Sequence, residues 1–487
     1  MLLFLAILNV DGLKPSIAAQ WTVSPKFTIR HEHTDNLFSS ETDTRSDSIT
    51  VISPGFETRL VNPDGELTVG YSAGYSVYDR YSQFNTLRHN ARARGTYQLA
   101  RDTVLEASDT FEYTEEGDPI DESADGVTEA DEMDRAEGIA DRIGRLDTIV
   151  RNRREPYYTN TAAISLTHQF GPMDTLAMRY THQLTENEDE TIADEAIHTP
   201  GFKMSYWLIP GQWSVEGGFQ IESGEYSDTP ADIGYRYESM NPSVGMGYRV
   251  DPLKMDIRGA LSYVRAEHSD ESDDFGNWEG RISISRQWSR YLGLSVGYAH
   301  TFMNYLTGES TDYRIHEPTV GAQLNLVEGF PVSINVGYFL KDQQGVEDES
   351  GWVVDGNIGP AWEFPRGSIR LNASSGYDQS YFGAEQLGFT TYYEVDGRAA
   401  YQLTRKISVD VSGTYRRDRY LEEEPVRKDR EKRIGCGLTA MPAQWLVLRA
   451  EYVYRALDST DPGDTYDENR VLVRATLTPR QPIRISP

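Results

Sequence analysis

An alternation of apolar and polar residues recurs along almost the whole length of this chain and limits the folds open to it. In residues 332–338 every second side chain is apolar, and Ser333, Asn335 and Gly337 stand between them. Successive side chains of a β-strand point to opposite faces, so this pattern gives one apolar and one polar face. Comparable segments lie at 67–77, 294–300, 407–415 and 471–477. We predict about twenty-two strands of about 9–12 residues, the length at which a tilted strand crosses a bilayer.

The connections between these segments are of two kinds that alternate along the chain. The short kind carries the Pro, Gly, Asn and Asp of tight turns and occurs at 62–65, 171–174, 210–212, 251–254, 365–367 and 442–444. The long kind is polar and acidic and occurs at 114–157, 185–198, 223–238, 266–277, 342–351, 417–428 and 456–468. This alternation is typical of membrane barrels, which have short periplasmic turns and long outer loops. We therefore predict an all-β, transmembrane, up-and-down antiparallel β-barrel with an even number of strands and both termini in the periplasm.

Composition removes several other classes. Beyond the first dozen residues no apolar run approaches the roughly 20 residues that a transmembrane helix needs. The 30 tyrosines and 41 glycines argue against a disordered acidic chain. The net charge of -29 would repel nucleic acid, so we expect no nucleic-acid partner. Cys436 is the single cysteine, which leaves no disulfide, Cys-x-x-Cys zinc site or haem attachment, and no cofactor is predicted.

The two ends of the chain differ from the repeating part. Leu2 to Val10 form a short apolar core, and small residues follow up to Ala19, so residues 1–19 are predicted to be an export signal. An apolar amino-terminal strand is the alternative. We assign residues 20–478 to the barrel and residues 479–487, which end at Pro487 without a terminal aromatic residue, to a short tail.

The two faces of the predicted strands carry different residues. Five tryptophans sit near segment ends on the apolar face, as in the aromatic belts of membrane proteins: Trp213, Trp278, Trp288, Trp352 and Trp362. The polar face carries many charges, which we predict to line the lumen: Arg92, Arg94, Glu106, Arg179, Lys203, Glu216, Arg258, Arg281, Asp355, Arg370, Asp396, Arg398, Asp410, Arg449, Glu451, Arg470 and Arg474. Isolated ions in a dry core would cost several kcal/mol each, so water or a guest must fill this interior.

The start of the repeating part resembles a known family. The resemblance rests on a first strand at 21–29, the motif Thr34-Asp35-Asn36-Leu37-Phe38, Asp47, the strand with Ser53-Pro54-Gly55-Phe56, and the strand at 71–81 that leads to Asn90. In these features the chain resembles the putative β-barrel porin 2 family of Gram-negative outer-membrane proteins, which includes members linked to exosortase and exopolysaccharide loci. The resemblance implies a pore-like outer-membrane barrel that serves polymer export, and it carries no catalytic motif.

Segment 114–157 is the most distinctive connection. Its first half is almost entirely acidic or small, whereas Ile139, Ile143, Leu146 and Val150 recur at the spacing of one helix face. We hypothesise that this helix folds into the barrel mouth and narrows it; the alternative is a surface loop whose helix packs on its neighbours. Acidic clusters such as 186–190 and 270–274 would bind Ca²⁺ that bridges to lipopolysaccharide, or are simply solvated loops.

No motif points to chemistry. Gly-x-Ser-x-Gly, a phosphate-binding Gly-x-x-x-x-Gly-Lys and His-Glu-x-x-His are all missing from the sequence. His31 and His33 flank Glu32 at the rim of the first strand, where a hydrated rim is favoured over a metal site. Three hypotheses remain, in order of preference: a pore for a hydrated polar solute or a secreted polysaccharide, a scaffold that sheathes a partner protein, and a barrel enzyme. The expected partners are outer-membrane lipid, lipopolysaccharide, and an export-machinery or plugging protein.

Overall fold

The computed structural model describes residues 20–116, 154–189, 192–227, 236–269, 274–307, 310–327, 330–343, 345, 348–382, 388–422, 425–461 and 463–485. Within those ranges no helix has the length and apolarity to cross a membrane. The predicted signal at 1–19 lies outside the described residues.

The described chain is almost entirely β-strand. The strands are β1 (Gln20–Thr34), β2 (Asp47–Asn62), β3 (Gly65–Tyr78), β4 (Thr86–Ala100), β5 (Thr103–Thr114), β6 (Tyr157–Gln169), β7 (Thr175–Asn187), β8 (Glu195–Ile209), β9 (Trp213–Tyr226), β10 (Arg236–Val250), β11 (Met255–His268), β12 (Phe275–Ser289), β13 (Leu292–Tyr305), β14 (Tyr313–Val327), β15 (Phe330–Gln343), β16 (Glu349–Phe364), β17 (Gly367–Ser380), β18 (Gly388–Thr404), β19 (Ile407–Tyr420), β20 (Arg427–Ala443), β21 (Leu446–Ser459), β22 (Tyr466–Leu477) and β23 (Ile483–Ile485). In the described connections there are two single-turn 3₁₀ helices, η1 (Ser82–Phe84) and η3 (Asp251–Leu253).

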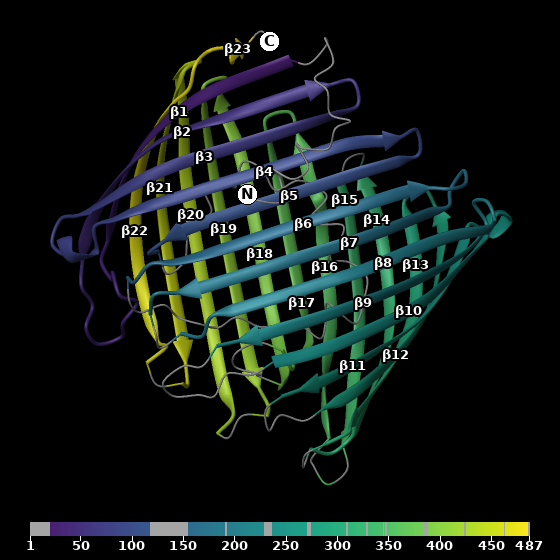
Figure 1. Ribbon diagram of the computed structural model, residues 1–487. Coiled ribbons are helices and arrows are strands. Elements are labelled where there is room, and N and C mark those ends of the chain that lie inside the picture. The colour runs from purple at the N-terminus through teal and green to yellow at the C-terminus, as the bar shows by residue number, and fades with distance from the viewer. Residues whose placement is uncertain are drawn as a thin grey trace.

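Each strand from β1 to β22 pairs antiparallel with the next, and β1 closes the sheet against β22. The closing ladder runs from Phe27↔Leu477 to Thr34↔Arg470. In the predicted tail, β23 continues this seam, since Ile485 pairs with Trp21. Closure satisfies the backbone donors and acceptors of both edge strands, which lipid cannot do. The predicted barrel class is therefore confirmed as a closed 22-stranded antiparallel barrel (Figure 1).

Tight turns gather at one end of the barrel and longer connections at the other. At the first end, β2 and β3 are joined by Pro63 and Asp64 alone, and the β10–β11 turn places Lys254 in the left-handed region at φ 48°. At the second end the connections include the long segment between β5 and β6. We call these the turn end and the loop end. The predicted alternation of short and long connections is present in the structure.

The outer wall is apolar between two bands of aromatic side chains. The middle carries exposed Val244, Val296, Val320, Val411 and Ile434. Near the turn end the outward aromatics include Tyr206, Trp213, Trp288, Tyr401 and Trp445, and nearer the loop end they include Tyr75, Trp278, Trp352, Tyr393 and Tyr415. Such rings favour the water–lipid interface because one edge is wet and the other is not.

Polar side chains on this outer wall satisfy one another across neighbouring strands. The phenol oxygens of three tyrosines contact the Nδ1 atoms of three histidines in the same diagonal register: Tyr71–His89 at 2.8 Å, Tyr180–His198 at 2.8 Å and Tyr298–His316 at 2.7 Å. An unsatisfied polar group facing hydrocarbon is costly, and these pairs remove that cost without crossing the wall.

Candidate functional site: the lumen

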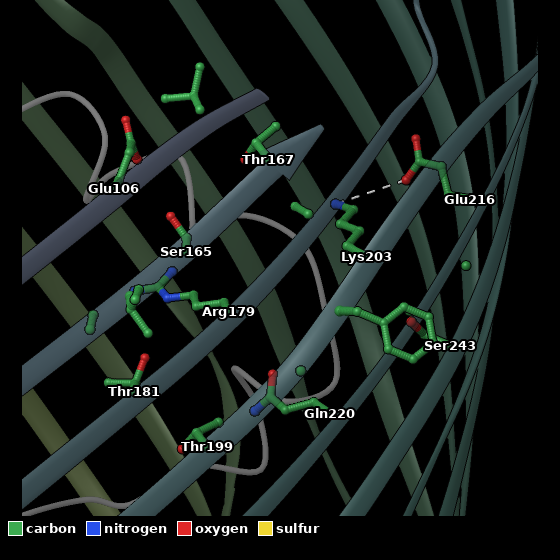
Figure 2. Close-up of a pocket in the computed structure, with 18 of the residues that line it drawn as sticks. Glu106, Ser165, Thr167, Arg179, Thr181, Thr199, Lys203, Glu216, Gln220 and Ser243 are labelled. Carbon is green, nitrogen blue, oxygen red and sulfur yellow. Dashed lines mark ion pairs between the residues drawn. The ribbon is translucent and has the colours of Figure 1, made fainter. Parts of the chain in front are cut away.

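The half of the lumen nearer the turn end contains a cavity of 2640 Å³ along β1–β12. The side chains that line it carry hydroxyl, amide and charged groups, interspersed with one another. Figure 2 shows Ser165 on β6, Arg179 and Thr181 on β7 and Gln220 on β9 along this wall, with Lys203 of β8 facing Glu216 of β9 at 4.0 Å. These residues come from the polar face of each strand, so the cavity follows directly from the period-2 pattern.

The charges that line the cavity balance. Among the described lining residues eight are basic and eight are acidic. The basic ones are Lys26, Arg92, Arg94, Arg179, Lys203, Arg249, Arg258 and Arg281, and the acidic ones are Glu57, Asp64, Glu66, Glu106, Glu216, Glu222, Asp256 and Glu279. Several lie in cross-strand pairs, for example Arg249 Nε with Asp256 Oδ1 at 2.8 Å. A chain with a net charge of -29 thus carries a neutral lining in this cavity.

The structure places the predicted lumen residues in two groups. Eight of them line the cavity on β4–β12, namely Arg92, Arg94, Glu106, Arg179, Lys203, Glu216, Arg258 and Arg281. The others lie on the inward parity of β16–β22, opposite in parity to the exposed apolar residues of the same strands: Asp355, Arg370, Asp396, Arg398, Asp410, Arg449, Glu451, Arg470 and Arg474.

Some charges of the second group make short contacts with neighbouring polar side chains. The guanidinium of Arg449 contacts Asp410 at 2.9 Å and Glu451 at 2.9 Å. Asn372 donates to Asp396 at 3.0 Å. In the same wall the sequence pattern did not single out Arg416, which reaches acidic side chains on three strands, including Glu394 at 3.0 Å. Arg449 and Arg416 each hold more than one carboxylate in short contact, which is the arrangement that partly buried ions require.

At the loop end a network of buried ion pairs connects β22 with β1, the two strands that close the barrel. Arg470 of β22 donates to Glu468 at 2.6 Å and lies 3.7 Å from Glu32 of β1. Arg30 of β1 contacts Glu116, which follows β5, and Arg88 of β4 contacts the same carboxylate at 2.5 Å. The side chains of these six residues are at most 12% exposed.

The arginines of this network favour the ionised form of the Glu116 carboxyl group. Burial alone would raise the pKa of its carboxyl, but Arg30 and Arg88, followed by Arg470 and Arg154, outweigh that effect and hold the pKa well below its usual range. Glu116 and Arg154 border segment 117–153, which lies outside the described residues and contains the helix predicted from Ile139, Ile143, Leu146 and Val150. The hypothesis that this helix narrows the mouth stays a prediction.

A second loop-end element folds across the lumen. The ladder between β16 and β17 ends at Val354↔Ser375, although β17 continues to Ser380 and remains paired with β18 up to Ser380↔Gly388. The tip of the β17–β18 hairpin, described at 376–382 and 388–391, therefore separates from β16, while its β18 side stays paired with β19 up to Thr390↔Tyr420. Gln379 donates to the phenol of Tyr313 on β14 at 2.7 Å and accepts from Asn277 on β12 at 3.0 Å. These bonds place the tip inside the barrel.

Aromatic residues hold this hairpin tip against the opposite wall. Tyr381 and Phe382 are 8% and 5% exposed, and Phe382 stacks on Tyr237 of β10 with ring centroids 4.6 Å apart. Phe275 of β12 packs on the rings of Tyr381 and Phe382. The whole cluster is built from Tyr226, Tyr237, Val264, Ala266, Phe275, Met303, Tyr313, Ile315, Phe339, Tyr377, Tyr381, Phe382 and Phe389. The loop-end half of the lumen is thus packed, whereas the turn-end half is open.

Sequence reasoning missed this closure. Period-2 analysis assigns side chains to a lipid face or a lumen face, and it has no means of predicting that a hairpin bends inward. One signal was present in the sequence. Tyr381 and Phe382 are adjacent aromatic residues in a connection at the loop end, and a connection that only faces water would not favour two apolar rings.

The rim histidines make simple hydrogen bonds. His31 Nδ1 lies 3.0 Å from Thr50 Oγ1, and His33 Nδ1 lies 3.0 Å from Ser48 Oγ. Across the described ranges no three His, Cys, Asp or Glu side chains gather in a way that could hold a metal ion. Cys436 is exposed on the outer wall.

Comparison with known proteins agrees with the barrel. Among similar solved structures are the siderophore receptor PirA from Pseudomonas aeruginosa (TM-score 0.53, 10% identity, covering 94% of this chain and 80% of that one) and a mutant of the ferric enterobactin receptor PfeA from the same organism in complex with enterobactin (0.57, 9%, 94% and 81%). The ferric-catecholate import receptor Fiu from E. coli K12 is another (0.55, 8%, 93% and 81%). At these identities the likeness is one of fold.

Sequence comparison supplies the family. No curated protein matches the chain. The family model described as "Putative beta-barrel porin 2" matches residues 17–165 and 298–478, which is most of the chain. The predicted resemblance, drawn from residues 21–90, is confirmed and extends to the carboxyl-terminal strands. The chain belongs to this porin family and is an outer-membrane β-barrel of porin-like type.

Proposed function

We propose that the barrel is a pore for neutral, hydrated, hydroxyl-rich solutes of the carbohydrate class. The observation that carries the proposal is the balanced lining of the turn-end cavity, eight basic against eight acidic residues interspersed with Ser and Thr. Pores that select ions present rings of one sign of charge. A lining with both signs and no excess attracts neither cations nor anions strongly, while its hydroxyls and ion pairs exchange hydrogen bonds readily with a hydrated solute.

The volume of the cavity supports a solute larger than an ion. At 2640 Å³ the turn-end cavity exceeds the roughly 300–1,000 Å³ of common small-molecule pockets. Its residues form an extended wall across twelve strands, which fits passage better than tight capture. Family membership favours a channel over an enzyme. The likeness to siderophore receptors is one of fold and gives no reason to assign a siderophore here.

The loop end supplies the control of passage in this proposal. Because short turns of outer-membrane barrels face the periplasm, the open cavity faces the periplasm and the packed hairpin tip faces outward. Solute would enter from the periplasmic side and leave when the tip moves. Export of a saccharide chain and diffusion of single sugars share this chemistry, and the length of solute that passes distinguishes them.

Liposome swelling with the purified barrel tests the proposal. We expect Tyr381→Ser/Phe382→Ser vesicles to admit uncharged sugars and short oligosaccharides, with rates that fall with size, and a KCl gradient to give a reversal potential near zero. Leu306→Ser, on an exposed loop-end side chain outside the cluster, is the matched control and should behave like the parent protein. Exclusion of all uncharged sugars, or a strongly ion-selective reversal potential, would overturn the proposal.

A further inference from the structure

A cluster of basic side chains lies on the outside of the barrel near the loop end. It consists of Arg417 and Arg419 of β19 with Lys428, Arg430 and Lys432 of β20, and we call it the outer cationic patch. All five are exposed. They share the outward parity of lipid-facing Val411 and Tyr415 on β19 and of Ile434 and Leu438 on β20, so they point away from the lumen.

The register sets like charges directly opposite one another. Arg417 pairs with Arg430 and Arg419 with Lys428, and Lys432 is the next outward residue, opposite Tyr415. Like charges facing each other across two strands destabilise a sheet. Two such pairs side by side, in a chain with a net charge of -29, call for an anion that lies between them.

Few acidic side chains of the protein lie close enough to the patch to act as that anion. Arg430 lies 3.3 Å from Asp458, and Arg419 lies 3.9 Å from Glu349. Arg417, Lys428 and Lys432 have no acidic partner among the described residues. Two other outward cations near the loop end each have an acidic partner: Arg236–Glu225 at 2.5 Å and Arg265–Glu267 at 2.8 Å. Within the part of the chain that the structure describes, the patch is thus a local excess of positive charge.

The height of the patch on the wall indicates which anion. Tyr415 and Ile434 mark the loop-end edge of the apolar wall, and the cations begin at the next outward position, about 7 Å further along each strand. Lipid headgroups lie at this level when the apolar wall sits in hydrocarbon. An anion attached to a lipid would therefore meet the patch with its acyl chains already against the apolar wall.

A small cavity adjoins the patch. It has a volume of 220 Å³ and lies where the β16–β17 ladder has ended, between Glu349–Trp352 of β16 and the outward residues of β18 and β19. Arg417 and Arg419 line it together with Trp352 and Tyr393, which are 58% and 53% exposed. Aromatic faces beside guanidinium groups suit a sugar ring that carries phosphate, since the ring stacks while Arg holds the phosphate in a bidentate pair.

From these observations we propose that the outer cationic patch and the adjoining cavity bind the phosphorylated sugar headgroup of an outer-leaflet glycolipid. The phosphates lie between the opposed cations of β19 and β20, and the sugar packs on Trp352 and Tyr393. The acyl chains continue down the apolar wall beside Val411 and Leu438. Binding would neutralise the two like-charge pairs and cover the outer wall where β16 and β17 separate.

Binding of bisphosphorylated lipid A to the full chain in detergent micelles tests the site. We expect the triple variant Arg417→Gln/Lys428→Gln/Arg430→Gln to lose at least tenfold in affinity, and Trp352→Ala to lose a smaller factor. The control Arg236→Gln/Arg265→Gln removes two outward cations that have acidic partners and should bind like the parent protein. Affinity should fall in the order bisphosphorylated, monophosphorylated, dephosphorylated lipid, and with rising salt.

Several results would overturn this proposal. They are equal binding by the triple variant, equal binding of dephosphorylated lipid, and equal competition by inorganic phosphate, which would show a site for free anions. Heat-modifiable migration on gels reports folding of each variant. If the triple variant fails to fold, the salt and phosphate dependence of the parent protein decides the question alone. Pore conductance does not enter this test, so its outcome is independent of the proposed solute.

Discussion

The two halves of the lumen are built from the same strands and yet differ in how their polar groups are satisfied. In the turn-end half, Lys203 and Glu216 lie 4.0 Å apart and both are well exposed. In the loop-end half, Arg470 and Glu468 lie 2.6 Å apart and are at most 2% exposed. Water solvates the first pair, whereas only protein partners solvate the second. One alternating pattern therefore gives either a wet wall or a packed one, according to what lies opposite it.

The packed half depends on aromatic residues that belong to a connection between strands. If the hairpin tip is the narrowest part of the pore, Tyr381→Ser/Phe382→Ser should raise single-channel conductance several-fold, because the narrowest section dominates the resistance of a pore. This is the greatest change that we expect from any variant. Conductance that equals that of Leu306→Ser would show that other elements close the loop end.

The buried ions should matter more to stability than the wet ones. Arg470→Met leaves Glu468 and Glu32 without their closest cation, and we expect a loss of about 3 kcal/mol in the free energy of unfolding. Lys203→Met removes the exposed partner of Glu216 in the cavity and should cost below about 1 kcal/mol. Urea unfolding in detergent, monitored by the gel shift of the folded barrel, measures both. Equal losses would contradict the contrast.

The wet half should respond in selectivity and hardly at all in stability. Glu216→Lys changes the balanced lining to an excess of two positive charges, and the reversal potential in a KCl gradient should shift toward anions. Ser165→Ala, on the same wall, should leave the reversal potential unchanged. A large loss of stability in Glu216→Lys would mean that this side chain is packed and not solvated.

The smallest effect that we expect concerns how the stability contributed by the buried Glu116 at the loop end depends on pH. The depressed pKa of Glu116 means that its ionised form stabilises the folded state above the ordinary carboxyl pKa, and that this contribution is lost only as pH falls through the depressed value. We therefore expect the difference in unfolding free energy between the parent protein and Glu116→Gln to stay constant from pH 7 to pH 5. A difference that shrinks across that window would show that the pKa is not depressed.

Much of the barrel follows from the sequence because one physical rule governs it. In a closed sheet between lipid and water, every strand must alternate, so segments such as 332–338 and 294–300 predict strands without any tertiary information. The inward parity of Arg92 or Arg449 follows from the same rule. The family resemblance seen in residues 21–90 also extends to most of the chain.

The state of the lumen could not be predicted in the same way. The pairing of Arg449 with Asp410 joins residues 39 positions apart and depends on strand register, which alternation alone does not set. The inward path of the β17–β18 hairpin depends on the end of one ladder at Ser375 and on aromatic partners from β10 to β15. Such contacts are non-local, and no local pattern encodes them.

The division of the lumen can be tested by labelling one introduced thiol in each half, in a Cys436→Ser background. The reagent is a polar, membrane-impermeant maleimide added from the turn-end side, and the rate of labelling measures the accessibility of each thiol. We predict rapid labelling of Ser165→Cys in the cavity and no labelling of Thr390→Cys, a fully buried position of the hairpin tip, until Tyr381→Ser/Phe382→Ser is also introduced. Equal labelling of both thiols in the otherwise unchanged barrel would mean that the lumen is not divided into an open turn half and a packed loop half.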